Sequence, residues 1–299
     1  MIIRAFGKVV EGIVKKTAFE TNTTVEEVQR QVSRHIEEIR LQYYLPSPKI
    51  KYNKLLCRAA YLHRHGAMQA TVFEHLIWLD KRIQTIISNA DKLHVVAIGG
   101  GPGTELLGLA KYLLSTPNVP RKLIFDVLDL IGQWGDTWRK LSAEVEHEFE
   151  RHLRNPPIIF PSFQRFNVFE TASYADYDFL STANIIVFNG IFSENKVTLD
   201  EAEHAVRHIW NKAPPGCAFV IIDRSEAKVR TRVTNMLRSV FGQDPTIRTI
   251  KGYLDGDEQI SDLGDATRIL GDPRKTYTAF SCVHIKPSVS EHHHIPKAA

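Results

Sequence analysis

The sequence predicts an α/β protein built on a doubly wound, mostly parallel sheet, and three observations lead to this prediction. Short β-rich runs alternate with helical periodicity between Leu93 and Phe241. A glycine-rich turn links the first of these runs to a helix. Two final strand-like runs, Thr246 to Leu254 and Thr276 to Lys286, have no convincing helix between them. Alternating elements imply a parallel sheet covered on both faces, and the final pair adds an antiparallel C-terminal hairpin strand, for seven strands in all.

Length and composition are those of a globular protein. The chain has 299 residues, 43 % of them hydrophobic, and its 38 Lys+Arg and 34 Asp+Glu give a net charge of +4. The longest apolar stretches, such as Asn184 to Phe192, hold roughly half of the ~18 to 20 residues that cross a bilayer, so we expect no membrane span. Cys57, Cys217 and Cys282 lie far apart, which predicts free thiols in a reducing, cytoplasmic environment. The acidic residues and histidines near the C-terminus lack regular ligand spacing, so we expect no metal site.

The first 51 residues predict a helical appendage. Apolar residues recur every three or four positions from Thr24 to Leu45, after a threonine pair that can cap a helix. Met1 to Lys16 carries a similar apolar stripe. A Pro-Ser-Pro segment then stops the second helix, because proline lacks the amide donor. We therefore expect a helical appendage and proline linker at 1–51, the main domain at 52–287 and a disordered tail at 288–299.

The main domain opens with helices and continues as alternating strands and helices. Tyr52 to Ala90 predicts two helices broken near Gly66. The elements expected after them, in chain order, are a strand at 93–98, a helix from 104, a strand at 122–128, a helix at 134–153, a strand at 162–169, a strand at 184–188, a helix at 199–212, a strand at 218–223 and a helix at 226–241.

The glycine-rich turn after the first strand is the motif that indicates a ligand-binding site. Gly99, Gly101 and Gly103 let the chain turn tightly and let a ligand approach the backbone. A P-loop is excluded because Thr104-Glu105 follows where Lys-Ser/Thr should stand. A dinucleotide fingerprint is excluded because Thr104 takes the place of its third glycine or alanine.

The G-x-G-x-G turn and the landmarks after it make residues 52 to 286 resemble the class I S-adenosylmethionine-dependent methyltransferases. The resemblance implies that Asp129, at the end of the second strand, accepts hydrogen bonds from the ribose hydroxyls of S-adenosylmethionine. It implies that Asn167-Val168 holds the adenine edge and that Asn189-Gly190 lies beside the transferable methyl. The cofactor-binding residues implied in this way are Gly99, Gly100, Gly101, Gly103, Asp129, Asn167, Val168, Asn189 and Gly190.

The chain departs from the family pattern at three positions. Ala97 stands where an acidic residue usually anchors the methionine moiety, and Asn167 stands where an acidic residue is common. Gly190-Ile191 replaces the two prolines of the Asn-Pro-Pro-Tyr/Phe element that holds a planar amine. Ala97 and the missing prolines support an alternative, a non-catalytic binding module with the methyltransferase fold that acts through its N-terminal helices. A nicotinamide oxidoreductase is the third interpretation.

Methyl transfer from a sulfonium needs in-line alignment and exclusion of water more than covalent help from the protein. A general base is needed only when the acceptor atom carries a proton. By family analogy Asn189 is the best-placed catalytic candidate, with Phe192 in the aromatic place. Ser193 and Glu194 follow as a polar lip of the site.

The acceptor is indicated by a basic, aromatic interval before the first strand. No acidic residue lies between Glu38 and Glu74. On a helix, Lys54, Arg58 and Tyr61 share one face, and Arg64 follows. Such a face suits an anionic acceptor, with RNA as the first candidate and a small acidic metabolite as the second. The same pattern also fits a solvated basic helix face. The candidate acceptor residues are Lys54, Arg58, Tyr61, Arg64 and Phe192.

Overall fold

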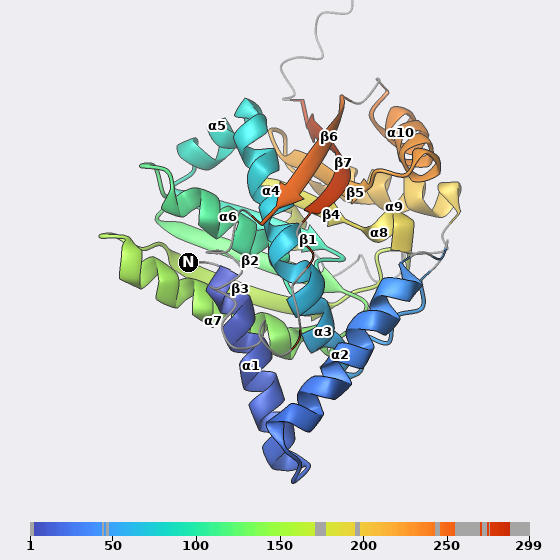
Figure 1. Cartoon of the computed structure of the whole chain (residues 1–299). Coiled ribbons are helices and arrows are strands. Elements are labelled where there is room, and N and C mark those ends of the chain that lie inside the picture. The colour runs from blue at the N-terminus through green and yellow to red at the C-terminus, as the bar shows by residue number, and fades with distance from the viewer. Residues whose placement is uncertain are drawn as a thin grey trace, which may run out of the picture.

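The computed structural model describes residues 3–43, 45, 48–170, 178–194, 198–242, 246–254, 270, 274 and 276–287. Its centre is a seven-stranded sheet in the order β3-β2-β1-β4-β5-β7-β6 (Figure 1). β1 to β5 are parallel, and β7 pairs antiparallel with both β5 and β6. The strands are β1 (Lys92–Ile98), β2 (Lys122–Asp129), β3 (Ile158–Arg165), β4 (Ile185–Asn189), β5 (Ala218–Arg224), β6 (Ile247–Tyr253) and β7 (Thr276–Ile285).

Helices cover both faces of this sheet, as the alternating sequence pattern predicts (Figure 1). Successive strand residues point to opposite faces, so Val95 and Ala97 belong to one buried cluster and Val96 and Ile98 to the other. Helices α1 to α7 pack over the first cluster and α8 to α10 over the second. The helices are α1 (Ile3–Glu20), α2 (Val25–Gln42), α3 (Leu55–Tyr61), the π-helical η1 (Leu62–Gly66), α4 (Ala67–Leu79), α5 (Lys81–Asn89), α6 (Thr104–Leu114), α7 (Trp134–His152), the 3₁₀ turn η3 (Asp178–Thr182), α8 (Ile191–Glu194), α9 (Leu199–Lys212) and α10 (Ala227–Phe241).

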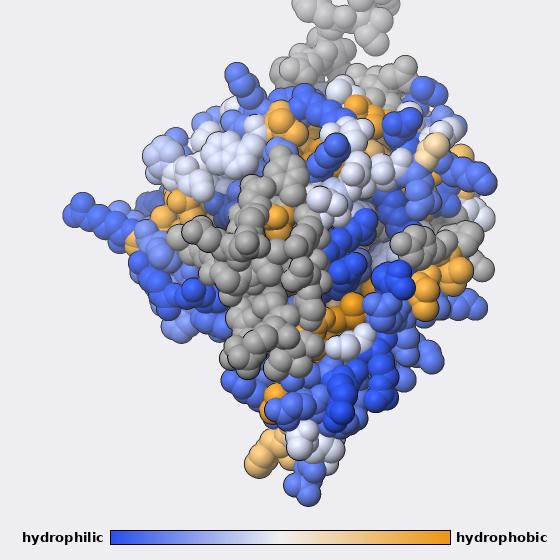
Figure 2. All heavy atoms as spheres, in the orientation of Figure 1, coloured by the Kyte–Doolittle hydropathy of each residue, from blue (hydrophilic) through white to orange (hydrophobic). Residues whose placement is uncertain are grey.

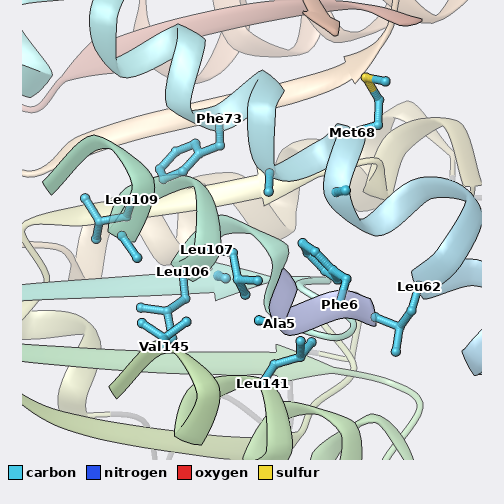
Figure 3. Packing of buried hydrophobic residues seen from close by; sticks show 14 of the residues in the cluster. Ala5, Phe6, Leu62, Met68, Phe73, Leu106, Leu107, Leu109, Leu141 and Val145 are labelled. Atoms are coloured by element: carbon cyan, nitrogen blue, oxygen red, sulfur yellow. The ribbon is translucent and has the colours of Figure 1, made fainter. Parts of the chain in front are cut away.

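Residues of the N-terminal helices α1 and α2 belong to the same large buried cluster as residues of the main domain. Figure 3 shows Ala5 and Phe6 of α1 beside Leu107 and Leu141, which belong to α6 and α7. Phe6 is fully buried. Its ring lies so close to Gly66 that a Cβ there would stand 2.7 Å from it. The sequence pattern gave the apolar stripe of α1 correctly but not the surface that the stripe covers.

The predicted break near Gly66 is wrong. Gly66 keeps helical dihedral angles, and α3, η1 and α4 form one continuous helical segment. The close packing of Phe6 explains why a glycine stands inside a helix. The break falls instead at Asp80, whose backbone is extended and whose carboxylate accepts a hydrogen bond of 3.0 Å from the Arg82 amide.

The third strand begins four residues earlier than the pattern indicates, at Ile158 rather than Ser162. β3 is the edge strand of the sheet, which leaves much of it exposed and weakens its alternation. An edge also tolerates Pro161, which cannot donate to a ladder. The predicted acidic loop at 255–265 and the predicted tail at 288–299 lie outside the described residues.

Hydrophilic side chains dominate the face of the molecule drawn in Figure 2, with small hydrophobic patches between them. Within the described ranges, we find no helix with the length and apolar character needed for a bilayer span. The same ranges contain no group of three or more His, Cys, Asp or Glu side chains able to hold a metal ion.

Candidate active site

The candidate site lies at the carboxyl ends of β1, β2 and β4 and starts from the glycine turn. Gly99, Gly101 and Gly103 have φ angles of +65°, +51° and +79°, which favour glycine. The Gly99 amide donates to the Leu128 carbonyl at 2.7 Å and fixes the turn to the end of β2. A Cβ at Gly103 would clash with the Trp138 ring, so this glycine serves helix packing.

Asp129 ends β2 and faces the turn. One carboxylate oxygen accepts a hydrogen bond of 2.9 Å from the Gly101 amide, and the other accepts one of 2.8 Å from the Ile131 amide. Burial raises the pKa of this carboxyl to about 6, although both amide hydrogen bonds lower it. Each oxygen keeps a second lone pair, so the ionised carboxylate can accept further hydrogen bonds.

A first cavity of about 240 Å³ opens beside these residues. Eight of the nine residues predicted to bind the cofactor line it, and Gly103 does not. The residues of this group that line the cavity are Gly99, Gly100, Gly101, Asp129, Asn167, Val168, Asn189 and Gly190. The structure thus brings together the ends of β1, β2 and β4 and the loop after β3, as the order of motifs predicted.

Three aromatic rings line another side of the first cavity. Tyr52, Tyr61 and Trp134 contact one another with ring centroids 5.2 to 5.6 Å apart. The Tyr61 hydroxyl also donates to the side-chain carbonyl of Gln69 at 2.7 Å. Through this cluster, the segment that precedes β1 contacts α7 at the cavity wall.

Asn189 ends β4, and a hydrogen bond to Glu105 fixes its side chain. Its side-chain amide nitrogen donates to one carboxylate oxygen of Glu105. Glu105 is fully buried in the first turn of α6, and burial raises its pKa to about 7. Its second oxygen has no hydrogen-bond partner among the described residues. Glu105 was not among the predicted site residues, and the signal that could have found it is an acidic residue one position after Thr104, directly behind the glycine turn.

Glu194 lies at the junction of two cavities. It lines both the first cavity and a second one. Its carboxylate accepts a hydrogen bond of 2.9 Å from the Tyr43 hydroxyl, which itself lies 3.1 Å from the Tyr52 hydroxyl. Burial raises the pKa of Glu194 to about 7, while Tyr43 and Arg224 act to lower it.

The second cavity has a volume of about 410 Å³ and adjoins the first. The two share Gln69, Asn189, Gly190 and Glu194. The charged side chains that line the second cavity are Arg40, Arg64, Arg224, Arg274, Glu194 and Glu226.

The predicted acceptor face is only partly present. Tyr61 lines the first cavity and Arg64 the second, while Lys54 is exposed at the start of α3 and lines neither. Arg58 is 4 % exposed and donates to the carbonyls of Tyr52 and Asn53 at 2.9 and 3.1 Å. The prediction of a shared basic face is therefore wrong at Arg58, because its guanidinium is occupied by backbone acceptors in the interior.

Phe192 also lies away from both cavities. Its side chain is buried, with its ring centroid 6.0 Å from that of Phe188. Its amide donates to the Asp223 carboxylate at 3.0 Å. The turn at Gly190, with φ of +69°, sends the chain into α8 and directs this aromatic ring into the core instead of toward the site.

No protein-family model and no curated protein matches the chain. Solved structures are distantly similar to it. An O-methyltransferase family protein from Burkholderia thailandensis is 12 % identical, with 88 % of this chain and 71 % of that chain covered and a TM-score of 0.46. A precorrin-6y C5,15-methyltransferase from Geobacter metallireducens GS-15 is 12 % identical over 68 % of this chain and 85 % of that chain, with a TM-score of 0.39. An N-methyltransferase from Bradyrhizobium japonicum WM9 is 12 % identical over 72 % and 97 %, with a TM-score of 0.39.

The observed architecture agrees with the fold predicted from the sequence. Five parallel strands are followed by a reversed β7 inserted between β5 and β6, and a glycine turn joins β1 to α6. Helices lie on both faces of the sheet. The chain therefore has a doubly wound, mostly parallel α/β fold of seven strands with an antiparallel C-terminal strand, as the sequence predicted.

Proposed function

We propose that this protein is an S-adenosylmethionine-dependent methyltransferase that binds its cofactor in the first cavity. The observation that carries the proposal is the convergence of the predicted cofactor residues, from four separate segments, on that cavity. The cavity also lies where the strand order reverses between β1 and β4. In open α/β sheets this reversal leaves a crevice at the carboxyl ends of the strands, and ligands bind there.

The residues present fit the cofactor. Asp129 keeps lone pairs for two ribose hydroxyls after accepting its two amide hydrogen bonds. A Cβ at Gly101 would lie 3.7 Å from the Trp134 ring and 4.0 Å from the Asp129 carboxylate, so the glycine leaves that space open to a ligand. Val168 and Phe169 add an apolar side suited to a purine.

When bound, S-adenosylmethionine supplies a methyl group already activated on a sulfonium. The protein's own residues then orient and shield it. Asn189, fixed by Glu105, presents its side chain where the two cavities meet. The Tyr52, Tyr61 and Trp134 rings exclude water, and Glu194 is placed to hold a proton at the same junction. Alignment and exclusion of water are what this transfer chiefly needs.

The first experiment separates this function from its alternatives. The full chain is titrated with S-adenosylmethionine, S-adenosylhomocysteine and NAD in a calorimeter, and then incubated with methyl-labelled cofactor and a cell extract. A methyltransferase binds the first two and transfers label. A non-catalytic module binds without transfer, and an oxidoreductase prefers NAD.

The acceptor and the compartment are finer parts of the proposal. Arginines around the second cavity support an anionic acceptor, of which RNA and a small acidic molecule are the two candidates. The three cysteines are buried and free, which supports a reducing compartment such as the cytoplasm.

A further inference from the structure

We propose that the second cavity is the acceptor site and that it binds a small acid, whose carboxylate or phosphate contacts the arginines and whose hydroxyl or amine gives its proton to Glu194. This inference rests on the proposed function of the first cavity. Of the helix-face residues indicated by the sequence, this site keeps Arg64 and adds residues from other parts of the chain.

The position of the second cavity fits an acceptor site. It meets the first cavity at Gln69, Asn189, Gly190 and Glu194, and these residues lie around the end of β4. A molecule in the second cavity would therefore face the end of the first cavity where the methyl is expected.

Arg224 is the residue best placed to bind an anion there. Its side chain is 12 % exposed, and its guanidinium lies over the Tyr43 ring at 4.6 Å. One terminal nitrogen is 3.8 Å from Glu226, whereas the other is buried without a hydrogen-bond partner among the described residues. A buried donor without a partner is unfavourable, and an anionic ligand that accepts its hydrogen bond would remove that cost.

His65 adds a neutral polar group to the lining of the second cavity. Its ring is buried and lines the second cavity, and its Nε2 has no hydrogen-bond partner among the described residues. Burial lowers the pKa of His65 to about 3, and Arg274, Arg64 and Arg224 lower it further in that order of effect. The imidazole is thus neutral at pH 7 and adds a polar group without adding charge.

Glu194 is the group in this cavity suited to accept a proton. It reaches both cavities, and burial raises its pKa to about 7, near the ideal value for a base at neutral pH. A lone pair of the acceptor forms a bond to the methyl carbon while the carbon–sulfur bond breaks and its electron pair stays on sulfur. The acceptor proton passes to Glu194. The sulfonium charge and the carboxylate charge disappear together.

The dimensions favour a small molecule over RNA. A volume of about 410 Å³ is in the range of small-molecule sites, which is about 300–1,000 Å³. RNA would need cations spaced along its phosphates, but Arg58 is buried and interrupts the basic face on which an RNA site would depend.

The test follows labelled methyl from S-adenosylmethionine into two fractions of a cell extract: molecules below about 1 kDa and purified total RNA. The full chain is used throughout. We expect label in small molecules that an anion-exchange resin retains. Label in RNA, or no label in either fraction although S-adenosylmethionine binds, would overturn the acceptor assignment. Failure of S-adenosylmethionine to bind would instead overturn the proposed function.

Variants then test the residues with the labelled fraction as substrate. Arg224→Gln should raise KM at least tenfold and leave the S-adenosylmethionine Kd within threefold, which also shows that the variant is folded. Arg230→Gln, an exposed arginine on α10, is the matched control and should change neither value. Should Arg224→Gln fail to fold, Arg64→Gln supplies the same readout. If a folded arginine variant has the same KM as the parent protein, the proposed anion site is refuted.

Glu194→Gln separates a base from a purely structural carboxylate. We expect kcat to fall 10²–10⁴-fold, in the range of general-base contributions, and kcat/KM to lose its rise between pH 6 and pH 8. Glu194→Asp should restore part of that rise. An unchanged pH profile in Glu194→Gln would exclude the proton transfer to this residue.

Discussion

The hydroxyl of Tyr43 donates a hydrogen bond of 2.9 Å to the carboxylate of Glu194, across 151 residues of sequence. Tyr43 stands at the C-terminal end of α2, and Glu194 ends α8 at the junction of the two cavities. The same tyrosine ring lies beneath the Arg224 guanidinium and 4.9 Å from the His65 ring. The N-terminal helices therefore contribute directly to the candidate active site.

Removing this hydrogen bond should shift the pH dependence of activity. The Tyr43 hydroxyl lowers the pKa of Glu194, so Tyr43→Phe should raise that pKa above its present value of about 7. Because the ionised carboxylate is the active form, kcat/KM should reach half its plateau at a pH higher by about 0.5 to 1 unit. Tyr112→Phe, on α6, is the control. A shift to lower pH would contradict the assignment of Glu194 as the base.

The N-terminal helices should also be necessary for folding. Phe6 is fully buried against Gly66, so Phe6→Ala should lower the free energy of unfolding by about 3–5 kcal/mol. Phe19 on the same helix is 88 % exposed, so Phe19→Ala should change the free energy of unfolding by less than about 0.5 kcal/mol. Urea unfolding measures both variants. Similar values for the two would mean that α1 does not belong to the core.

Asp129 should account for much of the cofactor affinity. Asp129→Ala removes the acceptor for two ribose hydroxyls, each hydrogen bond to a charged group being worth about 1.5–3 kcal/mol at most. We expect at least a tenfold weaker S-adenosylmethionine affinity by calorimetry, with the circular dichroism spectrum unchanged. Asp91→Ala, at an exposed aspartate before β1, controls for the loss of one negative charge. Equal affinities for the two variants would remove Asp129 from the site.

Buried Glu105 should make the protein less stable as the pH rises. Its folded pKa is raised from 4.5 to about 7, so the native state holds this proton more tightly than the unfolded chain does. The resulting stabilisation is present below pH 4.5 and is lost as the pH rises through about 7. Between pH 5.5 and pH 8 the free energy of unfolding should therefore fall less in Glu105→Gln than in the parent, by on the order of 1–2 kcal/mol. An equal fall in both proteins, measured by urea unfolding, would exclude this raised pKa.

The sequence predicted the elements whose signal is local. The β-rich runs, the glycine turn and the helix at 199–212 depend on neighbouring residues, and the structure places them within a few positions of the prediction. The sequence pattern was insufficient at positions whose structure depends on contacts with distant segments. From the sequence alone Gly66 predicts a helix break, because the packing of Phe6 against it is not visible there. In the same way Arg58 predicts a solvated basic face, because its two backbone carbonyl acceptors are known only from the structure.

The second cavity could not be predicted for the same reason. Arg64, Arg224 and Arg274 come from three distant parts of the chain, and only the folded sheet brings them to one space. Arg224 lies one residue beyond the strand predicted at 218–223, and its partner Tyr43 belongs to a helix that the sequence assigned to the N-terminal appendage.

The most direct test of the central claim is a calorimetric titration of the full chain with S-adenosylmethionine, alongside NAD and two glycine variants. We expect one saturable site of micromolar Kd for S-adenosylmethionine, with no comparable binding of NAD. Gly101→Val should abolish this binding, because its side chain would enter the cavity at a position with φ of +51°. Gly12→Ala, in open space on α1, should bind as the parent does. Absence of saturable S-adenosylmethionine binding in the folded parent, or undiminished binding in a folded Gly101→Val, would contradict the account.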